Sequence, residues 1–399
     1  MNDERILAYS DLALFVLVAI PIGILVGAIN AIFGIVLLHL TEVRMDHPFV
    51  LIPFLGFVGV GIVWCFQKFG GRSIKGMTLI FEAGHGASDD IPLRLIPFAI
   101  VGTWLTHLFG GSAGREGVAI QIGGTVAHSI GKRLPIADSR KILLITGMAA
   151  GFGALYRTPI AATLFAIEVL TVERMEYKAI LPALVASFVA SFVSGWLGLE
   201  KFTFPVTDIP AITVPLVFEL AVIGLAFGLT GGAFAFCLHA CKRCMTRKLP
   251  NPSLRILLVG IGISCFSLLC WNGRYSGLGT NLISMSFGTG FYPWDFALKF
   301  IFTVVTLSVG FQGGEVTPLF AIGASLGAVL GTAFGMPVPF AAALGYAAVF
   351  ASATNTLFAP IFIGAEVFGY DAMPFFFVVC VIAYVCSGRF SIYPLQKRL

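Results

Sequence analysis

The sequence predicts an all-α polytopic membrane protein made of two repeats, with broken helices that meet near the membrane midplane. The 399-residue chain has 58% hydrophobic and only 11% charged residues, with a mean hydropathy of +0.95, whereas soluble domains have about 25% charged residues. Its apolar runs are interrupted by 46 glycines and 20 prolines. Three short motifs recur in the same order in both halves. No polar stretch is long enough for a soluble domain, so we expect none.

The apolar runs differ in length along the chain. The first, residues 11–40, is too long for the apolar core of a signal peptide and fits a tilted membrane helix. Further long runs cover residues 49–66, 178–197, 211–240 and 254–271. Shorter, interrupted runs lie near residues 91–109, 116–130, 158–172, 315–334, 338–350, 355–369 and 373–386. Such breaks are tolerated in a membrane where protein or a watery cavity surrounds them.

The three recurring motifs are separated by nearly constant intervals. Residues 76–80 (GMTLI) match residues 279–283 (GTNLI), and residues 114–123 (GREGVAIQIG) match residues 314–323 (GEVTPLFAIG). The third match pairs Thr158, Ala161 and Glu168 with Thr356, Ala359 and Glu366. We therefore predict a first repeat over 1–207 and a second over 208–399, joined near the polar, proline-marked stretch 200–210. The matches leave open whether the repeats run parallel or inverted.

The central motifs place glycine directly before an apolar helix. A helix start presents unpaired N–H groups and the positive end of the helix dipole, which together suit an anion. Glu116 lies at such a start, so its carboxylate can occupy the anion site and leave when protonated. Ionisable residues inside a membrane are functional by default. We expect Glu116 to be functional, Arg115 to be structural, and Glu168 and Glu366 to accept backbone donors.

Basic residues cluster in two loops, which we expect to be cytoplasmic because such loops carry an excess of lysine and arginine. The first contains Lys132, Arg133, Arg140 and Lys141, and the second contains Lys242, Arg243, Arg247 and Lys248.

The motifs together resemble those of the CLC family of chloride channels and anion/proton antiporters. GREGVAIQIGG at residues 114–124 resembles the family's GREGP signature. Residues 76–80 stand where the family has GSGIP, and 314–318 where it has GxFxP. Residues 159–168 resemble the helix after the filter motif, and Tyr393 stands at the pore-lining tyrosine. The resemblance implies inverted repeats, a homodimer with one pathway per subunit, and a gating, proton-carrying role for Glu116.

Departures from these motifs narrow the resemblance. Met77 replaces the anion-coordinating serine, Val118 replaces the proline of GREGP and Val316 replaces the phenylalanine of GxFxP. This combination resembles the CLC-F clade, the bacterial fluoride/proton antiporters. It implies proton-coupled fluoride export across a bacterial inner membrane. The expected anion-binding residues are Met77, Gly117, Val118, Val316, Thr317 and Tyr393.

Two other functions remain open at this point. The family's inner proton glutamate is replaced by Val169, which favours a passive anion channel, and a chloride/proton exchanger is the other alternative. An enzyme is not expected, because the GxSxG matches at 110–114 and 323–327 lack a strand-to-helix turn and suitable partners. Cys241 and Cys244 have no further ligand at zinc spacing, so we expect no metal and no cofactor besides the transported ions.

Small residues recur every four positions at Ala183, Ser187, Ser191 and Gly195. Such a seam suits close helix packing. It fits packing either within one subunit or between two subunits.

Overall fold

The computed structural model describes residues 9–88, 90–269, 271–388 and 390–397, and within these residues the regular elements are helices. The first half of the chain forms α1 (Tyr9–Asp46), α2 (Pro48–Leu51), α3 (Leu55–Cys65), α4 (Met77–Gly84), α5 (Leu95–Leu108), α6 (Glu116–Gly131), α7 (Ser139–Tyr156), α8 (Pro159–Glu168) and α9 (Ile180–Trp196). The second half forms α10 (Val214–Lys248), α11 (Pro252–Leu269), α12 (Thr280–Phe287), α13 (Asp295–Ser308), α14 (Val316–Phe334), α15 (Val338–Thr354), α16 (Phe358–Phe368) and α17 (Met373–Val385). Short 3₁₀ and π segments join some of them, at Ile52–Phe54, Phe66–Gly70, Gly71–Lys75, Tyr177–Ala179 and Tyr370–Ala372.

Several helices are long and apolar enough to cross a membrane, among them α1, α10, α11 and α14. Their outer surfaces are apolar, with Trp196 of α9 80% exposed and Phe218 of α10 69% exposed. In water such a surface would be costly, and in a bilayer it faces lipid. The prediction of an all-helical membrane fold is therefore confirmed.

The helices α7 and α13 lie outside the predicted apolar runs. Sequence reasoning missed them because their composition is mixed: α7 carries Arg140 and Lys141 in its first turn, and α13 contains Asp295 and Lys299. All other residues of α7 are buried, many of them glycine or alanine. A helix wrapped by protein needs small side chains for close packing rather than a lipid-like surface.

The structure also corrects the prediction for two of the apolar runs, one expected to be interrupted and one expected to be continuous. The run 315–334 is one continuous 19-residue helix, α14, because Pro318 lies in its first turn, where a missing N–H costs nothing. The run 49–66 is instead divided by the 3₁₀ segment that contains Pro53.

Two helix pairs form the centre of the molecule, α6 with α7 and α14 with α15. A Cβ on Gly123 would overlap the carbonyl oxygen of Gly147, and a Cβ on Gly323 would overlap that of Gly345. Each pair therefore crosses at a glycine–glycine contact that no larger residue allows. The crossing in the second half uses the residue 200 positions after Gly123, so the recurrence in sequence corresponds to a recurrence in packing. The repeat boundary at residue 207 stays a prediction.

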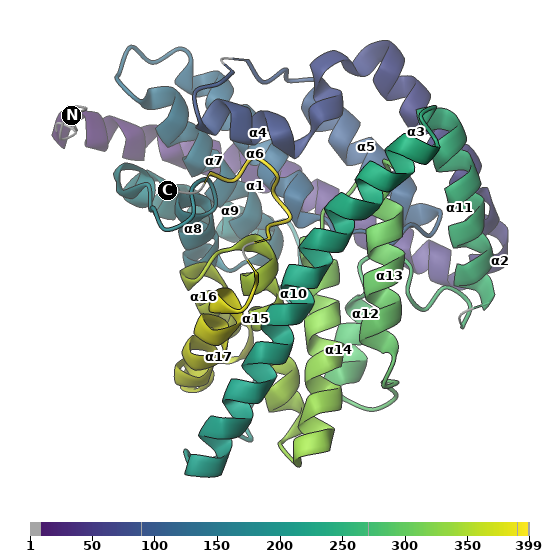
Figure 1. The fold of residues 1–399 in the computed structure, drawn as a ribbon. Helices are drawn as coiled ribbons and strands as arrows, with labels where there is room; N and C mark the ends of the chain where they lie inside the picture. Colours follow the sequence, from purple (N-terminus) through teal and green to yellow (C-terminus); the bar gives the residue numbers. More distant parts are fainter. Residues whose placement is uncertain (1–8, 89, 270, 389, 398–399) are drawn as a thin grey trace.

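In Figure 1 most helices of the first half lie above most helices of the second half, while α10 crosses obliquely in front and α11 lies beside α3. The C-terminal segment runs back from the second half toward α4 of the first half. This return stacks the ring of Tyr393 on Phe81, with centroids 5.1 Å apart.

The small-residue seam of α9 packs inside the subunit. Ser187 donates a hydrogen bond to the carbonyl oxygen of Pro159 at 3.1 Å, and Ser194 donates to that of Ala154 at 2.7 Å. A Cβ on Gly195 would lie 2.6 Å from the guanidinium of Arg157. Of the two arrangements left open by the sequence, the structure has the one within the subunit.

Candidate functional site

The two central glycine breaks touch each other. The N–H of Gly114 donates to the carbonyl oxygen of Gly314 at 2.5 Å, and the N–H of Gly314 donates to the carbonyl oxygen of Gly114 at 2.8 Å. A Cβ on Gly314 would lie 2.9 Å from the nitrogen of Gly117, and a Cβ on Gly114 would lie 2.9 Å from Pro318. Glycine at both positions thus lets α6 and α14 begin side by side, one from each half of the chain.

Glu116 is the first residue of α6 and is fully buried. Its Oε2 accepts hydrogen bonds from the backbone N–H of Thr317 at 2.9 Å and of Arg115 at 3.2 Å. Its Oε1 accepts a bond from the Thr317 hydroxyl at 2.5 Å. The carboxylate therefore occupies the N-terminus of α14, which is the place where the dipole and the free N–H groups of that helix would hold an anion.

Two side chains in this region carry donor atoms that have no hydrogen-bond partner among the described residues. Nε of Arg115 is 3.8 Å from Glu116 Oε1, and its Nε and Nη1 atoms are buried without a hydrogen bond. The Tyr393 hydroxyl is also buried and unbonded. Buried donors are nearly always satisfied in proteins, so these groups are suited to receive an anion.

A buried cluster holds the loop that leads to Glu116. Lys299 donates from Nζ to the Ser112 hydroxyl at 2.9 Å and to the carbonyl oxygens of Gly277 at 2.7 Å and Tyr275 at 3.1 Å. The hydroxyl of Thr306 accepts from the N–H of Ser112 at 3.2 Å. These bonds tie the loop before α6 to the loop before α12, so the break in one half is fixed by side chains from the other.

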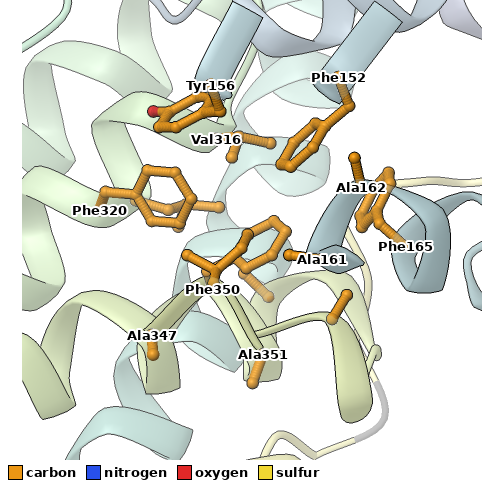
Figure 2. Packing of buried hydrophobic residues seen from close by; sticks show 14 of the residues in the cluster. Phe152, Tyr156, Ala161, Ala162, Phe165, Val316, Phe320, Ala347, Phe350 and Ala351 are labelled. Atoms are coloured by element: carbon orange, nitrogen blue, oxygen red, sulfur yellow. The ribbon is translucent and has the colours of Figure 1, made fainter. Parts of the chain in front are cut away.

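Five aromatic side chains form a closed circuit beside the start of α14. Neighbouring ring centroids lie 5.1–5.7 Å apart, and the five residues are Phe152, Phe165, Phe350, Phe320 and Tyr156. Figure 2 shows these side chains around Val316, drawn from α7, α8, α14 and α15. The circuit makes the flank of the site beside Val316 apolar.

Three further predicted site residues lie in different surroundings. Gly117 is buried in the first turn of α6, where a Cβ would lie 3.4 Å from the Cα of Gly314. Val118 packs into a separate apolar cluster with Phe33 and Leu155. Met77 is the partly buried first residue of α4.

Sequence reasoning missed three polar residues near Thr317. Glu315 directly precedes α14, and the oxygen Oε2 of its side chain would lie 3.9 Å from a Cβ on Gly117. The Tyr156 ring packs edge-on against Phe320 of α14 with centroids 5.5 Å apart, and the Tyr346 ring stacks on Phe320 at 4.0 Å. The signal for Glu315 was present, because the repeat match aligns it with Arg115. The two tyrosines stand in apolar helices and gave no local signal.

A cavity of about 580 Å³ opens beside Tyr393, near the C-terminal end of α10. His239, Lys242 and Arg243 contribute positive or ionisable groups to its wall. Tyr393 lines the same cavity, so basic side chains and this predicted anion ligand share one wall.

Comparisons with known proteins agree with this arrangement. A family model described as voltage gated chloride channel matches residues 58–388. A chloride/fluoride channel protein of Pseudomonas syringae pv. tomato is 36% identical over 385 residues, which are 94% of this chain and 84% of that protein. The crystal structure of a CLC-type fluoride/proton antiporter is 52% identical with a TM-score of 0.97, and the match covers 99% of this chain and 100% of the other. A slow cyanobacterial Cl⁻/H⁺ antiporter shares the fold, with a TM-score of 0.79 at 21% identity over 94% of each chain.

Proposed function

The chain belongs to the voltage gated chloride channel family, the CLC family, and from this premise we propose that it exchanges fluoride for protons and exports fluoride. The single observation that carries the proposal is the Glu116 carboxylate on the N–H and hydroxyl of Thr317. An anionic oxygen of the protein stands there in the place of a transported anion. The 52% identity with a fluoride/proton antiporter supports fluoride as that anion.

The geometry supports an exchange in which the carboxylate and the anion compete for one site. While Glu116 is ionised, it fills the start of α14 and excludes an anion. Protonation removes its negative charge and weakens the charge-assisted hydrogen bonds that hold it there. Fluoride then takes the donors, and the proton leaves with Glu116 toward the other side. Because each occupant of the site displaces the other, the two ions move in opposite directions.

Fluoride is small and strongly hydrated, so its site has to replace water with strong donors. Thr317 contributes a backbone N–H and a hydroxyl, and the unbonded groups of Arg115 and Tyr393 supply further donors. Met77 offers no donor, in line with a site that differs from a chloride site at this position. We assign Gly117, Val118 and Val316 to the helix starts that frame this site.

Fluoride enters cells as the neutral weak acid and is trapped as the anion, so inward proton flow would drive it out. We therefore place the protein in the inner membrane of a bacterium. We further propose a homodimer with one pathway per subunit, the two repeats 1–207 and 208–399, and no cofactor beyond the transported ions.

A liposome experiment tests this function. Purified protein is reconstituted with an imposed fluoride gradient, and the proton and fluoride fluxes are measured together. We expect protons to move against their own gradient at a constant ratio to fluoride. Fluoride flux without proton movement would favour a passive channel, the alternative that the apolar Val169 and the channel name of the Pseudomonas relative support. Equal transport of chloride would favour a chloride/proton exchanger.

A further inference from the structure

An apolar groove lies on the surface between α3 and α5. Its volume is about 680 Å³, and its lining is almost wholly aliphatic and aromatic. The walls include Trp64 of α3, Phe69 of the π segment after α3, and Val101 of α5. These three side chains are 52%, 52% and 48% exposed. The groove therefore opens outward, and in a bilayer it faces lipid.

Gly61 of α3 lines this groove without filling it. A Cβ on Gly61 would have no other atom within 4 Å, whereas a Cβ on Gly59 would lie 2.8 Å from the ring of Phe311. Glycine at position 59 thus allows close packing inside the protein, and glycine at position 61 leaves space on the lipid side. A hydrocarbon chain fits such a space by van der Waals contact, which is how apolar groups associate within a bilayer.

Two cations lie at the end of the groove that Phe69 forms. The Nζ atom of Lys68 is 5.0 Å from the ring centroid of Trp64 and 5.4 Å from that of Phe69. The Nη1 atom of Arg94 donates to the carbonyl oxygen of Phe69 at 3.1 Å. Both basic side chains are exposed. The two aromatic rings attract the ammonium group of Lys68 and hold it close to the apolar wall.

The ion pairs in this region leave these two cations without a carboxylate. Glu82 pairs with Lys75 at 2.7 Å and lies 3.8 Å from Arg72. In the part of the chain that the structure describes, neither Lys68 nor Arg94 forms an ion pair with a carboxylate. Positive charge beside an apolar groove is complementary to a molecule that has both an anionic group and a hydrocarbon tail.

The basic end of the groove lies on the same side of the molecule as the loop that contains Lys132. Asp90, in the segment before α5, pairs with Lys132 at 2.5 Å, and Arg94 follows four residues later. This loop is one of the two that we expect to be cytoplasmic, because of their excess of basic residues. The cytoplasmic leaflet carries anionic lipids, so these cations stand at the level of anionic headgroups.

From this arrangement we propose that the groove binds an anionic phospholipid of the cytoplasmic leaflet. One acyl chain lies between α3 and α5, and the phosphate lies on Lys68 and Arg94. Basic side chains beside a groove between membrane helices retain anionic headgroups. The groove is separate from the site of Glu116, so the proposal holds whichever anion the protein carries.

A lipid in this groove supports the segment that leads to α14. A Cβ on Gly102 of α5 would lie 2.7 Å from Cγ of Gln312, and a Cβ on Gly59 of α3 would meet Phe311. The inner faces of both helices therefore pack on the two residues that precede the glycine break before α14. Because the lipid binds the folded protein between α3 and α5, it raises the free energy of unfolding.

A lipid titration of the full chain in detergent tests the proposal. The purified protein is depleted of lipid and titrated with dioleoylphosphatidylglycerol, which is anionic, or with dioleoylphosphatidylcholine, which is zwitterionic. Native mass spectrometry measures the first lipid bound per chain, and thermal unfolding measures stabilisation. We expect the anionic lipid to bind about fivefold more tightly or better, the contribution of one basic residue near an anionic headgroup. It should also raise the unfolding midpoint more than the zwitterionic lipid does.

Two variants address the two parts of the site. Lys68→Gln removes a charge at the headgroup, so it should weaken phosphatidylglycerol binding about fivefold and leave phosphatidylcholine binding unchanged. Gly61→Phe fills the groove from a position where a Cβ meets no other atom, so the binding of both lipids should be lost.

Each variant has a matched control away from the groove. Lys248→Gln removes another exposed lysine, in the last turn of α10. Gly262→Phe changes a glycine of α11 at which a Cβ would also have no atom within 4 Å. Neither residue lines the groove, so both controls should bind the two lipids as the wild type does.

Equal affinity of the wild type for the two lipids would overturn the proposal. An unchanged preference for phosphatidylglycerol in Lys68→Gln would overturn it as well, and so would an equal loss of preference in Lys248→Gln. Unaltered binding in Gly61→Phe would show that the lipid lies elsewhere. If Gly61→Phe does not fold, the comparison of Lys68→Gln with Lys248→Gln decides by the same criteria.

Discussion

Glutamates at two kinds of helix start behave differently in this protein. Glu168, at the end of α8, accepts from the N–H groups of Leu357, Phe358 and Ala359, which begin α16. Glu366, in the last turn of α16, accepts from Ile160 at 3.3 Å and Ala161 at 2.8 Å, at the start of α8. Each helix of this pair therefore caps the other, as expected from the recurrence of the two glutamates in the repeats.

Glu116 also binds the start of a helix from the other half, but without reciprocity. It uses one backbone N–H and one hydroxyl of α14, together with the N–H of its own neighbour Arg115. Unbonded donors remain close to the site, on Arg115 and Tyr393. Rotation of the Glu116 side chain leaves both helices intact, whereas removal of Glu168 exposes the first N–H groups of α16. The comparison shows that a carboxylate at a helix start can be a permanent cap, as Glu168 is, or a side chain that can rotate away and free the helix start for an anion, as Glu116 is.

The largest effect is expected from Glu116→Gln. A neutral amide cannot carry a proton, so fluoride should move with proton flux reduced at least tenfold, while the thermal unfolding midpoint stays close to that of the wild type. Paired fluoride and proton fluxes in liposomes measure this. Proton coupling equal to that of the wild type in this variant would remove the central role of Glu116.

The next largest effect on transport is expected from Thr317→Val. This change keeps the shape and the backbone N–H but removes the hydroxyl at 2.5 Å from Glu116. A hydrogen bond to a charged group contributes about 1.5–3 kcal/mol, so the half-saturating fluoride concentration should rise by about tenfold or more. Thr317→Ser is the control, because it restores the hydroxyl. Equal fluoride half-saturation in the valine and serine variants would contradict the prediction.

Glu168→Ala is expected to affect stability rather than coupling. Loss of the cap leaves N–H groups at the start of α16 without acceptors, at a cost of about 1–3 kcal/mol. Thermal unfolding in detergent should begin at a lower temperature, while the remaining folded protein keeps its ratio of fluoride to protons. Glu366→Ala should show a smaller loss, because it releases two N–H groups rather than three. A changed ratio of fluoride to protons in either variant would contradict the assignment of Glu168 and Glu366 to a purely structural capping role.

The smallest effect is expected from Tyr393→Phe. Because the hydroxyl has no partner among the described residues, its removal should not lower the thermal unfolding midpoint, and the stacking on Phe81 is kept. The half-saturating fluoride concentration should rise about two- to fivefold, since one donor to the anion is lost. If fluoride binding stays unchanged in isothermal titration, Tyr393 is not an anion ligand.

Much of this site could be predicted from residue patterns. The glycine breaks at 114 and 314, the helix start at Glu116 and the role of Thr317 follow from local rules about helix termini. Glu315 was within reach of the same rules, since it aligns with Arg115 across the repeats. Tyr156 and Tyr346 were not, because a tyrosine in an apolar helix has the same local pattern whether it serves a site or fills a core.

The sequence alone determined the membrane class, the positions of the helix breaks and the recurrence of three motifs, because these depend on composition and on neighbouring residues. Only the tertiary structure decided that the carboxylate of α6 binds the N-terminus of α14, that α9 packs inward, and that α7 is a buried helix. Each of these contacts joins helices that are separated along the chain. Their partners are selected by the packing of both halves, which no local pattern contains.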